Sequence, residues 1–254
     1  MTEPVFSGVA VALLTFFDES GRIDAPATAE HAARLVELGI SAVVVAGTTG
    51  EPASLDLDER SALLEAVRKE VPSDVPVIAG TGAPSARQSA TMTILARDHG
   101  ADAAMVLSPP WVADPRPYYD CVAAAAGELP LLAYHFPAAS APGIPVELLS
   151  SLPVVGLKDS SGDAGRLLAE LAWDGSLYTG STYLTAYAGL MGCAGAILAL
   201  ANAEPERCVA AFNGDVEAQR ALVGPEAEAK QAFPQSLKLL TSRRFATPTT
   251  ARIC

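Results

Sequence analysis

The chain repeats one unit eight times: a short apolar run followed by an amphipathic segment. The runs are rich in Val, Ile, Leu and Ala, which is typical of strands buried on both faces. The segments between them carry apolar residues at helical spacing. The predicted strands cover residues 8–15, 42–46, 75–80, 103–107, 131–136, 154–158, 177–181 and 194–200. The predicted helices cover residues 25–38, 56–71, 85–99, 117–126, 146–151, 164–173 and 183–190. This alternation indicates a parallel sheet covered by helices.

Eight repeats within about 200 residues favour closure of that sheet, so the sequence predicts an α/β fold of the (β/α)8 TIM-barrel type. No GxGxxG motif follows the first strand and no GxxxxGK[ST] motif occurs, which disfavours dinucleotide-binding and P-loop folds. No Pro- or Ser-rich linker divides the chain. We therefore expect one domain, with the barrel in residues 1–202 and a short helical C-terminal extension in residues 203–254.

Charge and cysteine content limit the partners and the compartment. The chain carries 17 Lys and Arg against 29 Asp and Glu, a net charge of −12, which argues against nucleic acid or an anionic membrane as the main partner. No apolar run approaches the ~18 residues of a membrane-spanning helix, and the first residues lack the pattern of a secretory signal. No CxxC motif and no zinc-binding spacing is present among the cysteines, which are Cys121, Cys193, Cys208 and Cys254. These features predict a cytoplasmic protein without a metal site.

Lys158 is the sharpest chemical signal. In a TIM barrel, catalytic groups lie at the carboxyl ends of the strands, and Lys158 closes the apolar run 154–158. A desolvated amine has a lowered pKa and becomes a nucleophile. The alternative is a structural lysine paired with Asp159 or another carboxylate. The other lysines lie in charged or amphipathic segments, where we expect solvated surface positions; they are Lys69, Lys230 and Lys238.

Tyr134 lies in the strand that precedes the strand of Lys158. Sequential strands of a barrel are neighbours about 4.8 Å apart, so two inward side chains at similar heights can share one substrate. A phenol beside an amine can move protons during imine chemistry. The alternative is a packed core tyrosine with a hydrogen-bonded hydroxyl. His135 is expected to face the other side of the sheet as a structural residue.

The loop at 47–51, with the sequence GTTGE, follows the second predicted strand. Its glycines let the backbone approach a ligand, and successive N–H groups form an anion-binding concavity that fits a carboxylate. The alternative is an ordinary turn with a threonine as helix cap. Glu51 is interpreted as the partner of a neighbouring group and not as a general base.

Three motifs in this order resemble the N-acetylneuraminate lyase/dihydrodipicolinate synthase family of class I aldolases. They are GTTGE at 47–51, Tyr134-x-x-Pro137 and GLKDSSGD at 156–163, and the resemblance covers almost the whole chain. It implies that Lys158 forms a Schiff base with a 2-oxo acid and that Tyr134 relays protons. It also implies a homo-oligomer, as a dimer or a tetramer.

The resemblance further implies a set of substrate-binding positions. The threonine pair of the GTTGE loop helps to hold the carboxylate and to position the tyrosine, the backbone of Ile197 faces the substrate, and Ser181 contacts its tail. Trp111 stands near the place of paired tyrosines in many family members. The whole predicted binding set is Gly47, Thr48, Thr49, Trp111, Ser181 and Ile197.

Two departures from the family pattern bear on the substrate. The synthase branch has an arginine shortly after Tyr-x-x-Pro that binds a second carboxylate, whereas the stretch 138–143 is AASAPG. The indole of Trp111 donates a hydrogen bond but cannot relay a proton as a phenol does. The sequence after the barrel also looks short for the family, which could alter the association of subunits.

These observations predict a Schiff-base lyase or aldolase that cleaves or condenses a 2-oxo acid, with pyruvate as product or donor and no cofactor. A 2-keto-3-deoxy sugar acid fits the missing arginine. The alternatives are dihydrodipicolinate synthase-like condensation, a dehydratase or hydratase-aldolase that uses the same iminium, and a metal- or phosphate-dependent barrel enzyme. A binding or regulatory protein that holds a 2-oxo acid without turnover is the alternative from another class.

Overall fold

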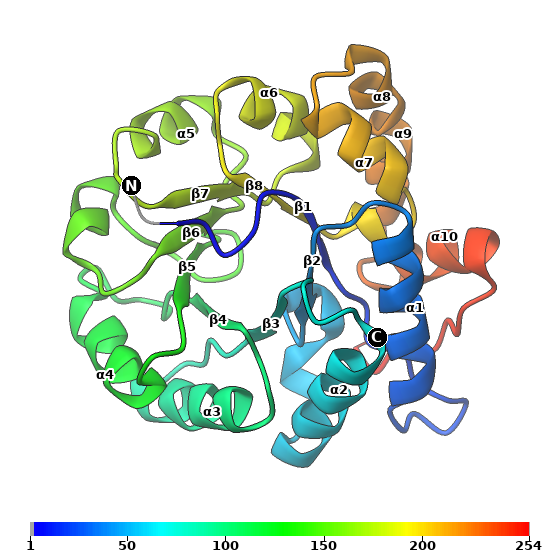
Figure 1. Ribbon diagram of the computed structural model, residues 1–254, viewed down its shortest axis with the longest axis horizontal. Helices are drawn as coiled ribbons and strands as arrows, with labels where there is room; N and C mark the ends of the chain where they lie inside the picture. Colours follow the sequence, from blue (N-terminus) through cyan, green and yellow to red (C-terminus); the bar gives the residue numbers. More distant parts are fainter. Residues whose placement is uncertain (1–2, 254) are drawn as a thin grey trace.

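Eight parallel strands close into a barrel in the computed structural model, which describes residues 3–253 (Figure 1). Each strand pairs with the next one along the chain, and the last strand pairs with the first. The strands are β1 (Gly8–Ala12), β2 (Ala42–Val45), β3 (Val77–Gly80), β4 (Ala103–Leu107), β5 (Leu131–His135), β6 (Gly156–Asp159), β7 (Ser176–Thr179) and β8 (Gly195–Leu198). The TIM-barrel prediction is confirmed, and every predicted strand overlaps an observed one.

Helices surround the barrel and follow the strands in turn (Figure 1). They are α1 (Ala25–Glu37), α2 (Leu57–Glu70), α3 (Ala86–Asp98), α4 (Arg116–Ala126), α5 (Ala164–Glu170), α6 (Thr185–Leu190) and α7 (Pro205–Phe212). A 3-10 helix, η3 (Val146–Ser151), takes the place of an α-helix between β5 and β6. Short 3-10 helices η1 (Thr48–Gly50), η2 (Pro52–Ser54), η4 (Thr182–Leu184) and η5 (Leu200–Asn202) begin several of the connections at the carboxyl ends of the strands.

Within the described residues, three further helices follow α7: α8 (Val216–Ala221), α9 (Val223–Ala229) and α10 (Gln235–Phe245). They gather with α7 on the side of α1 (Figure 1). The predicted boundary after residue 202 falls between η5 and α7. The assignment of 203–254 as an extension of the same domain stays a prediction. None of the helices within residues 3–253 is long and apolar enough to cross a membrane.

The barrel interior is filled by side chains from alternate strand positions, because successive residues of a strand point to opposite faces. At the amino-terminal end, Phe6 stacks on Tyr178 with ring centroids 4.5 Å apart. This buried interior group comprises Phe6, Ala10, Ala12, Ala42, Val44, Ile78, Ala103, Met105, Leu132, Tyr134, Tyr178 and Ile197. The opposite strand faces pack against the surrounding helices.

Lys238 corrects one expectation from the sequence. Its side chain, in α10, is fully buried, and Nζ donates hydrogen bonds to Oε1 of Glu51 at 2.6 Å and to the carbonyl of Thr250 at 2.7 Å. Glu51 lies 187 positions earlier, so the pattern of the segment around Lys238 could not indicate this partner. Lys69 and Lys230 are exposed, as predicted.

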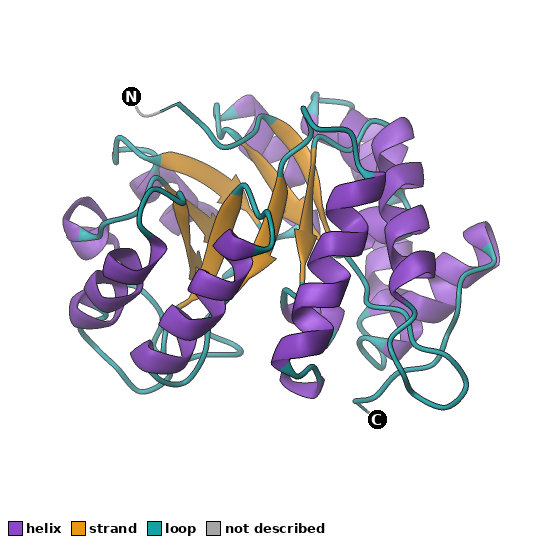
Figure 2. Cartoon of the chain, turned by 60° about the horizontal axis from the view of Figure 1, so that its bottom comes forward, coloured by secondary structure: helices purple, strands orange, loops and turns teal. Residues whose placement is uncertain are grey.

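The two termini lie at opposite ends of the barrel (Figure 2). The residues before β1 run along the amino-terminal end, where Phe6 lies. The residues after α10 reach the carboxyl end, where the backbone N–H groups of Arg252 and Ile253 donate to Glu51. The C-terminal segment therefore ends beside the loop that follows β2. Cys254 lies outside the described residues.

Candidate active site

Lys158 and Tyr134 are side by side inside the barrel. They are direct partners in the pairing of β5 with β6, and both point inward. The Nζ atom of Lys158 lies 4.3 Å from the centroid of the Tyr134 ring. Their exposed fractions are 5% and 4%. The expectation that neighbouring strands bring these two side chains together is confirmed.

In the part of the chain that the structure describes, no carboxylate pairs with Lys158. Asp159 points to the other side of the sheet, where its carboxylate accepts hydrogen bonds from the backbone N–H and the hydroxyl of Ser161, each at 2.8 Å. Within residues 3–253, Nζ of Lys158 makes no hydrogen bond or ion pair, and it lies over the Tyr134 ring. The structure thus excludes the alternative that Lys158 and Asp159 form a structural ion pair.

Two residues of the β7 region complete the surroundings of Lys158. Tyr178 is its partner in the pairing of β6 with β7, and its hydroxyl donates to the carbonyl of Phe6 at 3.1 Å, away from the mouth. Gly180 lies against the lysine stem, because a Cβ there would be 2.9 Å from Cε of Lys158 and would overlap Oγ of Ser160. Neither residue was predicted from the sequence as part of the site. The signal for Gly180 is a glycine at the carboxyl end of a predicted strand, where a close approach is needed.

The GTTGE loop lies at the carboxyl end of β2. Gly47 faces the interior, since a Cβ there would be 3.5 Å from Cε of Met105. The turn η1 brings the N–H of Gly50 to 2.9 Å from the carbonyl of Gly47, and the hydroxyl of Thr15 donates to the carbonyl of Gly50 at 2.8 Å. Thr49 is buried and Thr48 is half-buried; neither caps the following helix, because α2 is capped by Asp56. The loop is therefore a fixed turn rather than a simple helix start.

The other predicted binding residues occupy different environments. Ile197 is buried in the barrel interior with Tyr134. Ser181 is half-buried, lies two residues beyond β7, and donates its N–H to Oγ1 of Thr179 at 3.2 Å. Trp111 follows β4, but its side chain is 89% exposed, and its backbone N–H donates to the carbonyl of Ala141 at 2.7 Å. The structure brings Ile197 and Tyr134 together, whereas it leaves the indole of Trp111 in solvent.

A buried group of titratable side chains lies on the outer face of β5 and β6. His135 accepts the N–H of Ile144 at 2.8 Å through Nδ1, and burial, aided by the charge of Arg166, lowers the pKa of His135 to about 4. Burial raises the pKa of Asp159. Burial, together with the neighbouring charge of Asp159, raises the pKa of Glu170 to about 8, although Arg166 lies 2.7 Å away. His135 thus has the structural position that the sequence predicted.

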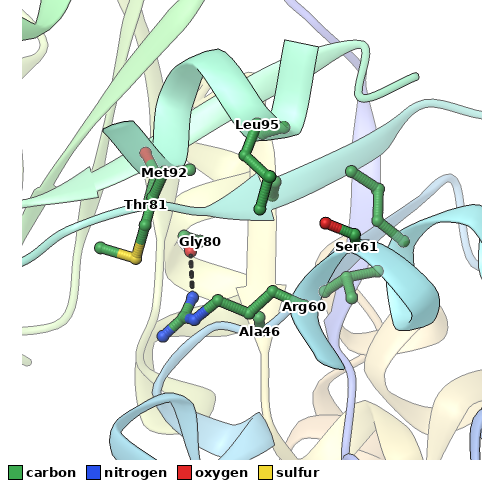
Figure 3. A pocket seen from close by; sticks show the side chains of 11 residues that line it. Ala46, Arg60, Ser61, Gly80, Thr81, Met92 and Leu95 are labelled. Carbon is green, nitrogen blue, oxygen red and sulfur yellow. Dashed lines mark hydrogen bonds between the residues drawn. The ribbon is translucent and has the colours of Figure 1, made fainter. Parts of the chain in front are cut away.

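A small crevice between α2, α3 and the ends of β2 and β3 is distinct from the barrel mouth (Figure 3). Arg60 extends along it and donates to the carbonyl of Gly80 at 3.1 Å and to that of Pro52 at 2.5 Å. Burial lowers the pKa of the Arg60 guanidinium. No predicted site residue is among the described residues that line the crevice. Through these hydrogen bonds, Arg60 connects α2 to β3 and to the segment after the GTTGE loop.

The fold and the site define a class of protein: a TIM barrel that holds a buried lysine beside a tyrosine at the carboxyl end of its strands. Within residues 3–253, no three His, Cys, Asp or Glu side chains are grouped so that they could hold a metal ion. The model of the dihydrodipicolinate synthetase family matches residues 5–253. The chain belongs to this family, and it is accordingly a Schiff-base-forming carbon–carbon lyase of the class I aldolase type.

The chain is similar to curated relatives over most of its length. It is 34% identical to a 4-hydroxy-tetrahydrodipicolinate synthase of Pseudomonas aeruginosa, covering 86% of this chain and 80% of the relative. It is 36% identical to the synthase of Natronomonas pharaonis, covering 87% and 80%. It is also 35% identical to an uncharacterized DapA-like lyase of Halobacterium salinarum, covering 84% and 75%.

Solved structures of the family show the same fold. A dihydrodipicolinate synthase of Bacillus anthracis superposes with a TM-score of 0.89 at 26% identity, covering 99% of this chain and 92% of that one. The synthase of Acinetobacter baumannii in complex with pyruvate superposes with a TM-score of 0.87 at 26% identity, covering 98% and 92%.

Proposed function

We propose that Lys158 is the lysine that forms the Schiff base, and that its substrate is a 2-oxo acid with pyruvate as product or donor. The observation that carries the proposal is the amine of Lys158, which is buried at the carboxyl end of the barrel, lies over the Tyr134 ring and has no carboxylate partner among the described residues. Pyruvate is the ligand of the Acinetobacter baumannii relative, which supports the choice of substrate.

In the cleavage direction, the amine of Lys158 attacks the C2 carbonyl and the carbinolamine loses water to give an iminium. The iminium accepts the electron pair of the C3–C4 bond as that bond breaks, the C4 hydroxyl gives up its proton to the relay, and an aldehyde leaves from the C4 side. The enamine that is formed takes a proton at C3, and hydrolysis then releases pyruvate and the free lysine. Tyr134 is the proposed proton relay, because its ring contacts the amine.

The substrate carboxylate is proposed to bind at the GTTGE loop. Gly47, Thr48 and Thr49 lie at the mouth of the barrel, and their backbone N–H groups and hydroxyls are suitable donors for an anion. The backbone of Ile197 and the hydroxyl of Ser181 are proposed to contact the remainder of the substrate. A carboxylate held in this way orients the carbonyl towards Lys158.

The tail of the substrate is proposed to lack a second carboxylate, as in a 2-keto-3-deoxy sugar acid. The segment 138–143 that follows β5 contains no cationic side chain. It is held by the hydroxyl of Ser140, which donates to the carbonyl of Ser108 at 2.6 Å, and by the N–H of Trp111. The second candidate is the condensation reaction after which the Pseudomonas aeruginosa relative is named.

A homo-oligomer in the cytoplasm is proposed as the working form. The exposed indole of Trp111 stands beside the barrel mouth, and a contact with another subunit would cover its apolar surface. The cysteines of the described residues are free, which suits a reducing compartment.

The test is borohydride reduction in the presence of pyruvate, followed by mass spectrometry of the intact chain and its peptides. We expect a reduced pyruvyl adduct on the peptide that contains Lys158. Lys158→Ala should form none, whereas Lys230→Ala, at an exposed lysine, should form as much as the unchanged protein. Failure to trap pyruvate or any other 2-oxo acid of a small panel would contradict the proposal. Turnover assays with aldehydes that carry or lack a second carboxylate then separate the two substrate candidates.

A further inference from the structure

Glu51 has its whole carboxylate engaged by the C-terminal segment. The side chain is fully buried. Oε1 accepts a hydrogen bond from Nζ of Lys238 at 2.6 Å, and Oε2 accepts the backbone N–H groups of Arg252 and Ile253, each at 2.8 Å. We name this group, Glu51 with Lys238 and residues 250–253, the Glu51 anchor. Its carboxylate has no role in proton transfer at the barrel mouth, because both oxygens are bound to these donors.

The side chain of Arg252 extends the anchor to the segments on both sides. Nε donates to the carbonyl of Gly21 at 2.6 Å, and Nη1 donates to the carbonyl of Ser54 at 2.8 Å. The same guanidinium pairs with Glu59, the residue that completes the capping box of α2. The C-terminal segment therefore connects the segment after β1, the GTTGE loop and the start of α2.

The backbone of Glu51 needs this support. Its φ is +56°, in the left-handed region that residues other than glycine rarely adopt. Such a conformation persists only when surrounding contacts fix it. Glu51 directly follows the turn Thr48–Gly50, so the orientation of its peptide determines where that turn lies. The hydroxyl of Ser54 adds a hydrogen bond to the carbonyl of Glu51 at 2.8 Å.

We propose that Glu51 is a positioning residue for the carboxylate-binding turn and that the C-terminal segment, through Lys238 and residues 250–253, sets the affinity for the 2-oxo acid. This inference rests on the proposed binding of the substrate carboxylate by Thr48 and Thr49. A change in the anchor displaces the donors of the turn while the amine of Lys158, on the other side of the barrel mouth, stays in place. The consequence is weaker binding of the acid with the same capacity to form the imine.

The experiment measures borohydride trapping of pyruvate as a function of pyruvate concentration. In Glu51→Gln, the acceptor oxygen is kept while the charge is lost, and the pyruvate concentration at half-maximal trapping should rise about 10-fold or more, the effect of weakening one hydrogen bond to a charged group. The maximal extent of trapping should be unchanged. Lys238→Met should behave in the same way, and the double variant Glu51→Gln/Lys238→Met should recover part of the affinity because no buried charge is left alone. Lys230→Met is the matched control and should leave the curve unchanged.

If Glu51 and Lys238 had a solely structural role, the maximal extent of trapping would fall and the pyruvate concentration at half-maximal trapping would stay unchanged. That result would overturn the inference. If the core variants fail to fold, truncation after Thr249 removes the two N–H donors to Glu51, the carbonyl that accepts from Lys238 and the side chain of Arg252. These groups lie in a part of the chain that is only partly buried, and the same shift is expected. An unchanged curve for a folded truncation also contradicts the inference. The absence of any adduct in the unchanged protein contradicts the proposed function instead, so the two failures are distinguishable.

Discussion

The barrel mouth and the Glu51 anchor each contain a buried lysine in contact with an aromatic ring. Lys158 is 5% exposed and its Nζ lies 4.3 Å from the Tyr134 ring centroid, whereas Lys238 is 0% exposed and its Nζ lies 4.4 Å from that of Phe17. The two sites differ in the carboxylate, because Glu51 accepts a hydrogen bond from Lys238 and, within residues 3–253, no acidic side chain reaches Lys158. Burial alone therefore does not distinguish the two lysines; among the described residues, the fixed anionic partner of Lys238 does.

The largest expected effect separates the two lysines by activity. Lys158→Met should lower turnover by at least about 10³-fold, because the nucleophile is lost. Lys238→Met should retain most of its turnover at saturating substrate, since its amine is outside the barrel mouth. Steady-state release of pyruvate from a cleaved substrate measures both. Comparable losses of turnover in the two variants would contradict the assignment of different roles to the two lysines.

The second effect separates the same lysines by stability. Lys238→Met leaves the carboxylate of Glu51 buried without its ionic partner, so the free energy of unfolding should fall by about 3–5 kcal/mol. Lys158→Met replaces an amine that has no ionic partner among the described residues by an apolar chain of similar length. It should change the free energy of unfolding by less than about 1 kcal/mol. Urea unfolding followed by circular dichroism gives both values. A larger loss in Lys158→Met would mean that this lysine is structural.

The contrast also explains what could be predicted from the sequence. Each strand is a local pattern, and neighbouring strands follow each other along the chain, so the barrel and the meeting of Lys158 with Tyr134 could be derived from short segments. The pair of Glu51 and Lys238 joins positions 187 residues apart, and an amphipathic segment gives no sign of which buried charge will find a partner. The exposure of Trp111 was equally inaccessible, because loop geometry after β4 decides it.

The third prediction tests whether the site around Lys158 is as tightly fitted as the anchor. In Gly180→Ala, the new methyl group would overlap Oγ of Ser160 and would lie 2.9 Å from Cε of Lys158, and we expect the end of the lysine stem to move together with the serine hydroxyl. A displacement of about 1 Å can cost on the order of 10²-fold in rate, and we expect a loss of that size in kcat. Gly224→Ala, where a Cβ meets no other group within 4 Å, is the control. A full rate in Gly180→Ala would show that the lysine stem has room to move.

The smallest expected effect is on the pH dependence of stability, and it concerns Glu170. This buried carboxyl group on the outer face of the barrel wall contrasts with that of Glu51. Among the described residues, Glu51 has three donors, whereas Glu170 has one cationic neighbour, Arg166, and lies near a second carboxylate, that of Asp159. Burial and that second carboxylate raise the pKa of Glu170 to about 8, above its ordinary value of 4.5, so the folded chain holds a proton that the unfolded chain releases between these pH values. The free energy of unfolding should therefore fall as the pH rises from about 5 to 8, on the order of 1–3 kcal/mol.

Glu170→Gln keeps the shape of the side chain and removes its titration. The difference in unfolding free energy between this variant and the unchanged protein should therefore vary with pH over the same interval, with the variant relatively more stable at pH 8 than at pH 5. Taking a difference is necessary because burial also lowers the pKa of His31 to about 3, which makes stability rise with pH between about 3 and 6.5 and opposes the effect of Glu170. A difference that stays constant from pH 5 to pH 8 would show that Glu170 is ionised in the fold. Arg166 would then neutralise it as fully as Lys238 neutralises Glu51.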